Sequence, residues 1–217
     1  MKNVRKSVSA ILLVLVLIMS SSAYSQDKND ILDRKIALDF ASADFITVLD
    51  TLALKERLPI GLERSSKPSV VKLDIHAADM TVRETLNVIT EQDPNYQWRL
   101  CDGVINFSPV KDRSVILQNF LKTNVSDFSQ RAGTSRFKLR DALFNAPEVS
   151  DFLKSNYVEG LKEYYAYKQS DYSADSLDLE LKNKDVRSIL NTIAKNTEFR
   201  IWVVELSQDG KKLLVTF

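Results

Sequence analysis

Residues 71–107 read VKLDIHAADMTVRETLNVITEQDPNYQWRLCDGVINF and change their hydrophobic period twice. Apolar and polar side chains alternate over 71–76, as in a strand with one buried face. Over 82–89 the apolar residues recur three or four positions apart, which places them along one side of a helix. An Asp-Pro pair then ends this helix, because proline cannot continue it. Alternation returns over 96–107 around an Asp-Gly pair typical of a tight hairpin, so the segment predicts the order strand, helix, strand, strand.

The start of this helix carries a signal of its own. Asp79 or Thr81 can cap it, since a short side-chain oxygen there accepts a hydrogen bond from an unpaired backbone N–H. Glu84 lies three residues after Thr81, which is the spacing of a capping box. The helix is therefore predicted to begin after one of these two residues.

The same pattern occurs again near the C-terminus. A shift of 104 positions (177 minus 73) superposes seven residues on identical ones without a gap. The pairs are Leu73 with Leu177, Asp74 with Asp178, Val82 with Val186, Arg83 with Arg187, Leu86 with Leu190, Asn87 with Asn191, and Ile89 with Ile193. Two further alternating runs follow, on either side of Asp209-Gly210. An internal repeat is stronger evidence of architecture than any local motif, so we expect two related modules.

The first module includes a strand and a helix upstream of residue 71. Alternation over 36–40 predicts a strand, the apolar spacing within 44–57 predicts a helix, and 59–63 predicts a short strand. Together with 71–107 they give the order β-α-β-β-α-β-β over residues 35–110. We therefore predict an α+β protein of two tandem modules, each with two helices packed on small sheets.

The first half of the chain resembles a known family in this order of elements and in its apolar patterns. The segments that carry the resemblance are IALDF (36–40), FITVL (45–49), VKLDI (71–75), VRETL (82–86) and YQWRL (96–100). They are similar to the short N-terminal (STN) domain shared by secretins and TonB-dependent receptors. The resemblance implies a periplasmic module of the envelope of a bacterium with two membranes, which contacts partner proteins.

Residues 113–217 are predicted to form a second, divergent copy of this module. Its first strand is expected over Val115–Phe120. The start of its first helix is indicated by the apolar residues Leu139, Ala142 and Leu143, which have the same spacing as in the first module. The helix region is expected to be long and bent at Pro147, because a helical insertion over 147–162 has no counterpart in the family pattern. The next strand is expected close to Tyr164–Tyr172.

Residues 1–25 have the three parts of a secretory signal peptide. A basic start is followed by an unbroken apolar run over 10–19, and then by Ala23 and Ser25, the small residues that a signal peptidase accepts. The apolar run is shorter than the roughly 20 residues of a membrane span, which disfavours the alternative of an uncleaved anchor. We therefore expect a periplasmic protein that begins near Gln26, with a flexible leader over 26–34 and no membrane span after cleavage.

Composition argues against several classes of protein. The formal net charge is +1, whereas a nucleic-acid-binding domain is normally basic. Cys101 is the only cysteine, so no intramolecular disulfide can form. Cys101 is expected to act as a small hydrophobic residue on a strand, and the alternative is a reactive or intermolecular thiol.

The titratable residues do not suggest catalysis. His76 is the only histidine, and its place in an alternating strand favours exposure to solvent over a role in a catalytic triad. Zinc-ligand spacing and a glycine-rich phosphate loop are both missing from the sequence. The acidic pairs Asp39 with Asp44 and Asp178 with Glu180 are more typical of solvated surfaces than of acid/base sites. We therefore expect no catalytic residue, no cofactor, no metal and no enzymatic activity.

Five tyrosines form the candidate partner interface, since tyrosine is enriched where proteins meet. They are Tyr157, Tyr164, Tyr165, Tyr167 and Tyr172. The alternative is that they alternate on a strand and belong to the core.

The preferred interpretation is an exported, non-catalytic module that binds another envelope protein. The alternative is a periplasmic protein that binds a small ligand or a cell-wall fragment, in a pocket lined by Trp98 or Trp202. A hydrolase is the third class, which the shortage of titratable groups disfavours.

Overall fold

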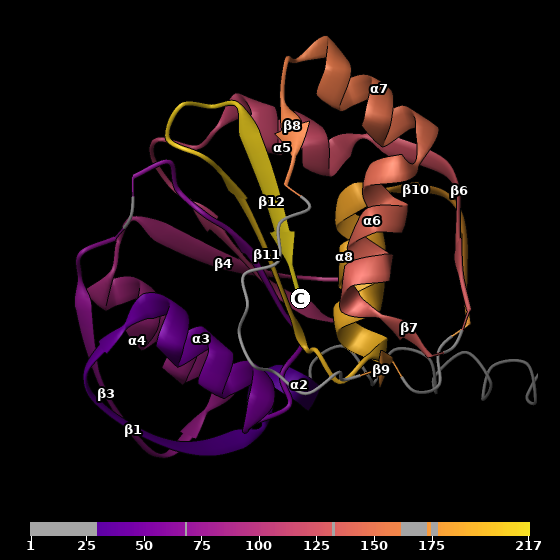
Figure 1. Cartoon of the computed structure of the whole chain (residues 1–217). Coiled ribbons are helices and arrows are strands. Elements are labelled where there is room, and N and C mark those ends of the chain that lie inside the picture. The colour runs from indigo at the N-terminus through magenta and orange to yellow at the C-terminus, as the bar shows by residue number, and fades with distance from the viewer. Residues whose placement is uncertain (1–29, 68, 132, 162–172, 175–177) are drawn as a thin grey trace, which may run out of the picture.

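Figure 1 shows the computed structural model, which describes residues 30–67, 69–131, 133–161, 173–174 and 178–217. The elements of the first half are α2 (Asp30–Asp33), β1 (Lys35–Asp44), α3 (Phe45–Leu54), β2 (Ile60–Glu63), β3 (Lys72–Thr81), α4 (Val82–Gln92), β4 (Tyr96–Cys101) and β5 (Val104–Pro109). Those of the second half are α5 (Val115–Lys122), β6 (Asn124–Gln130), β7 (Thr134–Ser135), α6 (Arg136–Asn145), α7 (Pro147–Ser155), β8 (Glu159–Gly160), β9 (Ser173–Ala174), β10 (Leu179–Asp185), α8 (Val186–Asn196), β11 (Ile201–Leu206) and β12 (Lys212–Thr216). Helices and small sheets are mixed along the chain, so the predicted α+β class is confirmed.

A six-stranded sheet runs through the middle of the molecule in the order β4-β5-β2-β11-β12-β8. The hairpins β4–β5 and β11–β12 are antiparallel, whereas β2 is parallel to β5 and β8 is parallel to β12. The two halves meet where β2 and β11 pair in parallel. Outside this sheet, β1 pairs with β3, β6 with β10, and β7 with β9.

Helices cover both faces of the six-stranded sheet (Figure 1). On one face, α3 and α4 pack over apolar side chains of β2 and β5, including Ile60 and Phe107. On the other face, α5, α6 and α8 pack over side chains of β11 and β12, including Val204 and Leu213. The neighbours Ile201 and Trp202 on β11 belong to different cores, as the alternation of a strand requires. The strand β11 therefore joins the two cores.

The predicted start of α4 is confirmed in detail. The Thr81 hydroxyl accepts a hydrogen bond from the Glu84 N–H (3.2 Å), and the Glu84 carboxylate accepts one from the Thr81 N–H (2.8 Å), which completes a capping box. The hydrogen bonds that the Thr81 N–H and hydroxyl donate to the Glu84 carboxylate lower the pKa of this carboxyl. The cap is therefore Thr81 rather than Asp79.

The prediction of a strand over Val115–Phe120 is wrong, because these residues belong to helix α5. The Ser114 hydroxyl caps this helix by accepting a hydrogen bond from the Leu117 N–H (3.2 Å). Leu117, Phe120 and Leu121 are buried, at a spacing of three and four residues that fits a helix. The strand that pairs with β10 is β6, which follows the helix.

Two further boundaries differ from the prediction. The helical region does break at Pro147, but the helix α7 ends at Ser155, well before residue 162. Within the predicted flexible leader, Asp30–Asp33 form a turn of helix, and Leu32 is buried in the first core. The predicted signal peptide lies outside the described residues. In the part of the chain that the structure describes, no helix is both long and apolar enough to cross a membrane.

The repeated apolar positions are buried in both halves. Val82, Leu86 and Ile89 on α4 and their counterparts Val186, Leu190 and Ile193 on α8 have no exposed surface. Leu73 is also fully buried, whereas its counterpart Leu177 lies outside the described residues.

We expect the variants Leu86→Ala and Leu190→Ala each to lose about 2–5 kcal/mol of unfolding free energy, the usual cost of deleting a buried leucine. Urea unfolding of the purified protein measures this loss. Leu54 on α3 is 63% exposed, so Leu54→Ala is the matched control and should change little. A loss below about half a kcal/mol at both buried positions would contradict the assignment of these residues to the cores.

Candidate functional site

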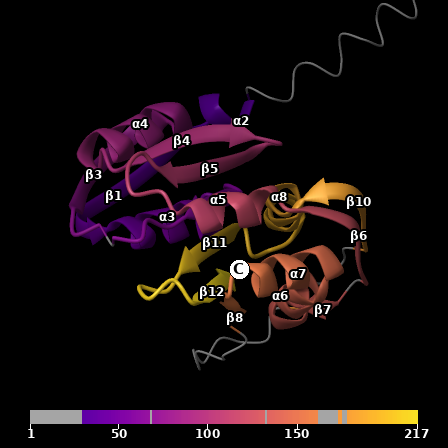
Figure 2. The ribbon, with the colours of Figure 1, turned by 90° about the horizontal axis from the view of Figure 1, so that it is seen from above.

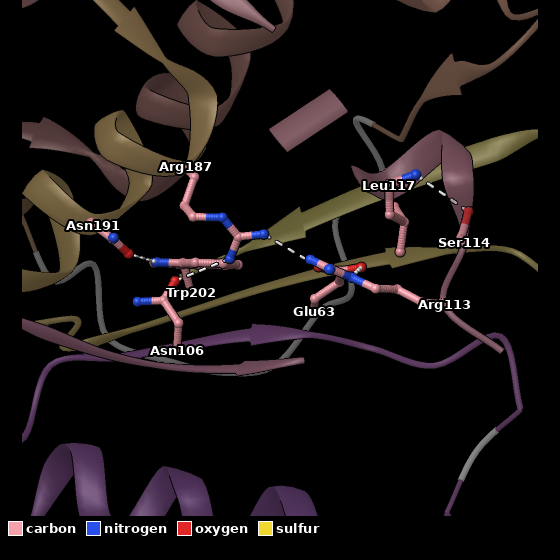
Figure 3. Close-up of polar contacts among 8 residues, drawn as sticks. All are labelled: Glu63, Asn106, Arg113, Ser114, Leu117, Arg187, Asn191 and Trp202. Atoms are coloured by element: carbon pink, nitrogen blue, oxygen red, sulfur yellow. Dashed lines mark hydrogen bonds and ion pairs between the residues drawn. The ribbon is translucent and has the colours of Figure 1, made fainter. Parts of the chain in front are cut away.

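The junction between β2 and β11 places an indole ring directly on a glycine. Trp202 is opposite Gly61 in the parallel register, and it is fully buried. A Cβ atom on residue 61 would lie only 2.3 Å from the Trp202 ring, which no real Cβ contact allows. The Trp202 Nε1–H donates a hydrogen bond to the Asn191 side-chain oxygen at 2.9 Å (Figure 3). Gly61 is therefore required for the close contact between the two halves.

A buried carboxylate lies two residues farther along β2. Glu63 is completely buried, and its two oxygens accept hydrogen bonds from Arg113 Nε (2.7 Å) and Nη2 (2.6 Å). Arg187, in the first turn of α8, donates to the same carboxylate at 3.3 Å and to the Asn106 side-chain oxygen at 3.1 Å (Figure 3). The Arg187 guanidinium also lies 5.8 Å from the centre of the Trp202 ring. We call Gly61, Glu63, Asn106, Arg113, Arg187, Asn191 and Trp202 the junction cluster.

The junction cluster has one more positive than negative charge. Hydrogen bonding to Glu63 raises the pKa of Arg113, whereas burial lowers the pKa of Arg187. An arginine nevertheless remains protonated at neutral pH, and both Glu63 oxygens are occupied by guanidinium groups. The junction cluster therefore offers no group for proton transfer, and it stabilises the contact between the halves.

Most of the junction cluster does not stand out in the sequence, but the repeat does point to the tryptophan. The shift of 104 residues that maps Asn87 on Asn191 also maps Trp98 on Trp202. In the first half, the Trp98 Nε1–H donates to the Asn87 side-chain oxygen at 3.1 Å, which matches the Trp202–Asn191 bond. By contrast, the roles of Gly61, Glu63 and Arg113 depend on contacts between distant segments, which no local pattern reveals.

His76 and the acidic residues that were predicted to lie on solvated surfaces have exposed side chains. The His76 side chain is 71% exposed, and its Nδ1 lies 2.6 Å from an Asp39 oxygen on the outside of the β1–β3 pair. Asp44 pairs with Lys72 at 2.6 Å, and Glu180 lies 3.6 Å from Lys182. Among the described residues, no group of three potential metal ligands converges.

Cys101 is the last residue of β4 and is half-buried. Its carbonyl oxygen accepts a long hydrogen bond from the Asn191 amide at 3.5 Å. Its position on a strand agrees with the prediction.

Of the five candidate interface tyrosines, only Tyr157 can be placed. It is 91% exposed and has a positive φ of 56°, in the turn between α7 and β8. Tyr157 therefore does not belong to the core. Tyr164, Tyr165, Tyr167 and Tyr172 lie outside the described residues.

The six-stranded sheet ends at β4 on one side and at β8 on the other (Figure 2). An end strand exposes a row of backbone N–H and C=O groups that can pair with another chain. On β4, the side chains of Gln97 and Arg99 are exposed, and Trp98 is half-buried.

Two open clefts lie close to these end strands. One, of about 750 Å³, lies between α6, α7 and β8, and its lining includes Phe144, Ser150 and Lys154. The other, of about 450 Å³, lies beside α4 and is lined by Asp79, Met80, Glu84, Asn87, Val88 and Glu91. Neither cleft is lined by a tryptophan, and Trp202 is too deeply buried to contact a ligand.

Comparisons with known proteins leave the family open. No protein-family model matches the chain, and neither a curated protein nor a solved structure matches it.

Proposed function

We propose that this protein is an exported, non-catalytic interaction module of the bacterial envelope, similar to the STN domains of secretin and TonB-dependent systems. The apolar N-terminal run, flanked by basic and small residues, supports export to the periplasm. The matching Trp98–Asn87 and Trp202–Asn191 bonds support two modules of common design. The near-neutral net charge argues against nucleic acid as the partner.

The observation that carries this proposal is the way in which the two halves join. The edge strand β2 of one three-stranded sheet accepts β11 of the other as an added parallel strand. Strand addition is a common mode of protein recognition, in which backbone hydrogen bonds supply affinity and side chains supply specificity. Strand addition therefore joins the two halves of this protein, and the end strands β4 and β8 can bind a partner in the same way.

Binding of a small ligand or a cell-wall fragment is less well supported. The tryptophans do not line the clefts, and both Lys154 and Asp151 beside the larger cleft are solvated surface residues with 77% exposed side chains. Ligand sites usually combine an apolar wall with a few converging polar groups. A protein interface fits the exposed strand ends and Tyr157 better.

Export is tested by expressing the full chain in a bacterium with two membranes. We expect the protein in the periplasmic fraction, with Gln26 as its first residue, because the segment over 1–25 satisfies the exporter and its peptidase. N-terminal sequencing measures this. Membrane-bound protein that still begins with Met1 would contradict the proposal.

Interaction is tested by replacing Tyr157 with a photo-crosslinking phenylalanine analogue in living cells. Val70 is 90% exposed and serves as the matched control, since Tyr157 is 91% exposed. We expect a discrete adduct with an envelope protein from position 157 and none from position 70. Identical adduct patterns at both positions, or no adduct at position 157, would contradict the proposal.

A further inference from the structure

The free edge of β4 is the counterpart of the edge of β11 that pairs with β2. The shift of 104 residues carries Trp98 on β4 to Trp202 on β11. Each indole donates to an asparagine of the helix packed beside it, at 3.1 Å and 2.9 Å respectively. On β11, the edge opposite β12 pairs with β2, whereas β4 is the end of the sheet.

Part of the helix beside β4 is also open where its counterpart is covered, although its first turn packs against α2, where Arg83 pairs with Asp33. On α8, Arg187 donates to Asn106, Asn191 donates to the Cys101 carbonyl, and Lys195 lies against Gly103, so this side of the helix faces the sheet of the first half. The counterparts on α4 are Arg83, Asn87 and Glu91. Asn87 and Glu91 line the open cleft of about 450 Å³. Part of the surface of the first half is therefore built like the surface with which the second half holds β2, and among the described residues no strand pairs with it.

We propose that β4 accepts, as an added parallel strand, an extended segment of another polypeptide that resembles β2, with a glycine opposite Trp98 and a carboxylate two residues later. This deepens and rests on the proposed function, because it assigns the β4 edge and the kind of segment that binds there.

The glycine follows from the register of the internal junction. Trp202 lies opposite Gly61, and any side chain there would overlap the indole ring. Because Trp98 is the counterpart of Trp202, a strand added at β4 in the same register meets an indole at the same place. A residue without a Cβ fits there, which selects glycine.

The carboxylate follows from the arginine on the first turn of the helix. Arg187 binds Glu63, which lies two residues after Gly61. Its counterpart Arg83 has a half-exposed side chain, 44% accessible, and its ion pair with Asp33 is long at 3.6 Å. Arg83 can therefore exchange this weak surface pair for a carboxylate of the added strand.

The experiment uses the mature protein, labelled with ¹⁵N, and a synthetic peptide of residues 57–66, which contains Ile60-Gly61-Leu62-Glu63. The protein has two tryptophans, so its two indole N–H signals report on the open edge and on the internal junction separately. We expect the Trp98 signal to shift on titration, the Trp202 signal to stay, and the β4 amides to gain protection from hydrogen exchange.

Two substitutions test the chemistry. A peptide with Gly61→Val should bind at least about tenfold more weakly, which corresponds to about 1.4 kcal/mol. The protein variant Arg83→Glu should weaken binding of the original peptide by a similar factor, whereas Arg131→Glu, the same charge change on an exposed residue of the second half, should not.

The inference would be overturned if the Trp98 signal did not shift at millimolar peptide, or if the Gly61→Val peptide bound as tightly as the original peptide. Shifts of both indole signals would also overturn it, because the peptide would then enter the internal junction. Self-association of the protein through β4, seen by sedimentation velocity with a shifted Trp98 signal, would also overturn it, because the occupant would then be a second copy. Crosslinking at Tyr157 does not depend on β4, so it separates failure here from failure of the proposed function.

Discussion

Trp202→Ala is expected to cost about 3–5 kcal/mol of unfolding free energy, the range for deleting a buried large aromatic side chain. Trp202 has no exposed surface and belongs to the core of the second half, while its ring rests on Gly61 of the first. Its loss removes the packing at the junction and leaves the buried Asn191 side-chain oxygen without its donor. A stability of 5–15 kcal/mol is typical of a domain, so the variant should be close to unfolding at 37 °C.

Trp98→Ala is the matched control, because Trp98 makes the same hydrogen bond to an asparagine but is only half-buried at the end of the sheet. We expect it to cost less than half as much as Trp202→Ala. Chemical denaturation followed by circular dichroism measures both variants. Equal losses would show that the junction adds nothing to the stability of the second half.

The elements predicted with success are those in which neighbouring residues determine the structure. The strand, helix and hairpin of 71–107 became β3, α4, β4 and β5, because the capping box, the Asp-Pro stop and the Asp-Gly turn all act within a few residues. At the turn, Asp102 and Gly103 have the positive φ angles of 54° and 77° that a tight hairpin requires. In the second hairpin only Gly210 has a positive φ, because five residues rather than two separate β11 from β12.

The failures have different physical causes. Val115–Phe120 contains apolar residues that suit either a short strand or a helix, and the Ser114 cap together with burial against α8 decides for the helix. The joining of the two sheets could not be predicted, because it depends on the contact between Gly61 and Trp202. Glycine has no side chain and so adds nothing to a pattern of apolar residues. Glu63 is charged, so an apolar pattern does not identify it as a buried residue.

The junction has consequences for folding as well as for binding. Ile201 packs in the first core while its neighbour Trp202 packs in the second, so neither core is complete without β11. The two halves should therefore unfold together, as one cooperative unit, although each contains its own helices and hairpin.

Glu63→Gln is expected to cost about 3–5 kcal/mol, because it removes the counter-charge of two guanidinium groups at a site away from water. The side chains of Arg113 and Arg187 are only 27% and 13% exposed, so solvent cannot replace the lost carboxylate. Glu205→Gln is the matched control: Glu205 pairs with Arg64 across the same junction, but both side chains are about one-third exposed, and such pairs contribute about 1 kcal/mol or less.

A further variant separates charge from packing at this site. Adding Arg113→Met and Arg187→Met to Glu63→Gln removes the unpaired charges, so the triple variant should be more stable than the single one, although the change at Arg187 also removes the donor to the buried Asn106 side-chain oxygen. Urea unfolding at neutral pH measures all three proteins. If Glu63→Gln costs no more than Glu205→Gln, or if the triple variant is less stable than the single one, then the two arginines do not depend on the charge of Glu63, and the halves are held together by Trp202 and the parallel strands alone.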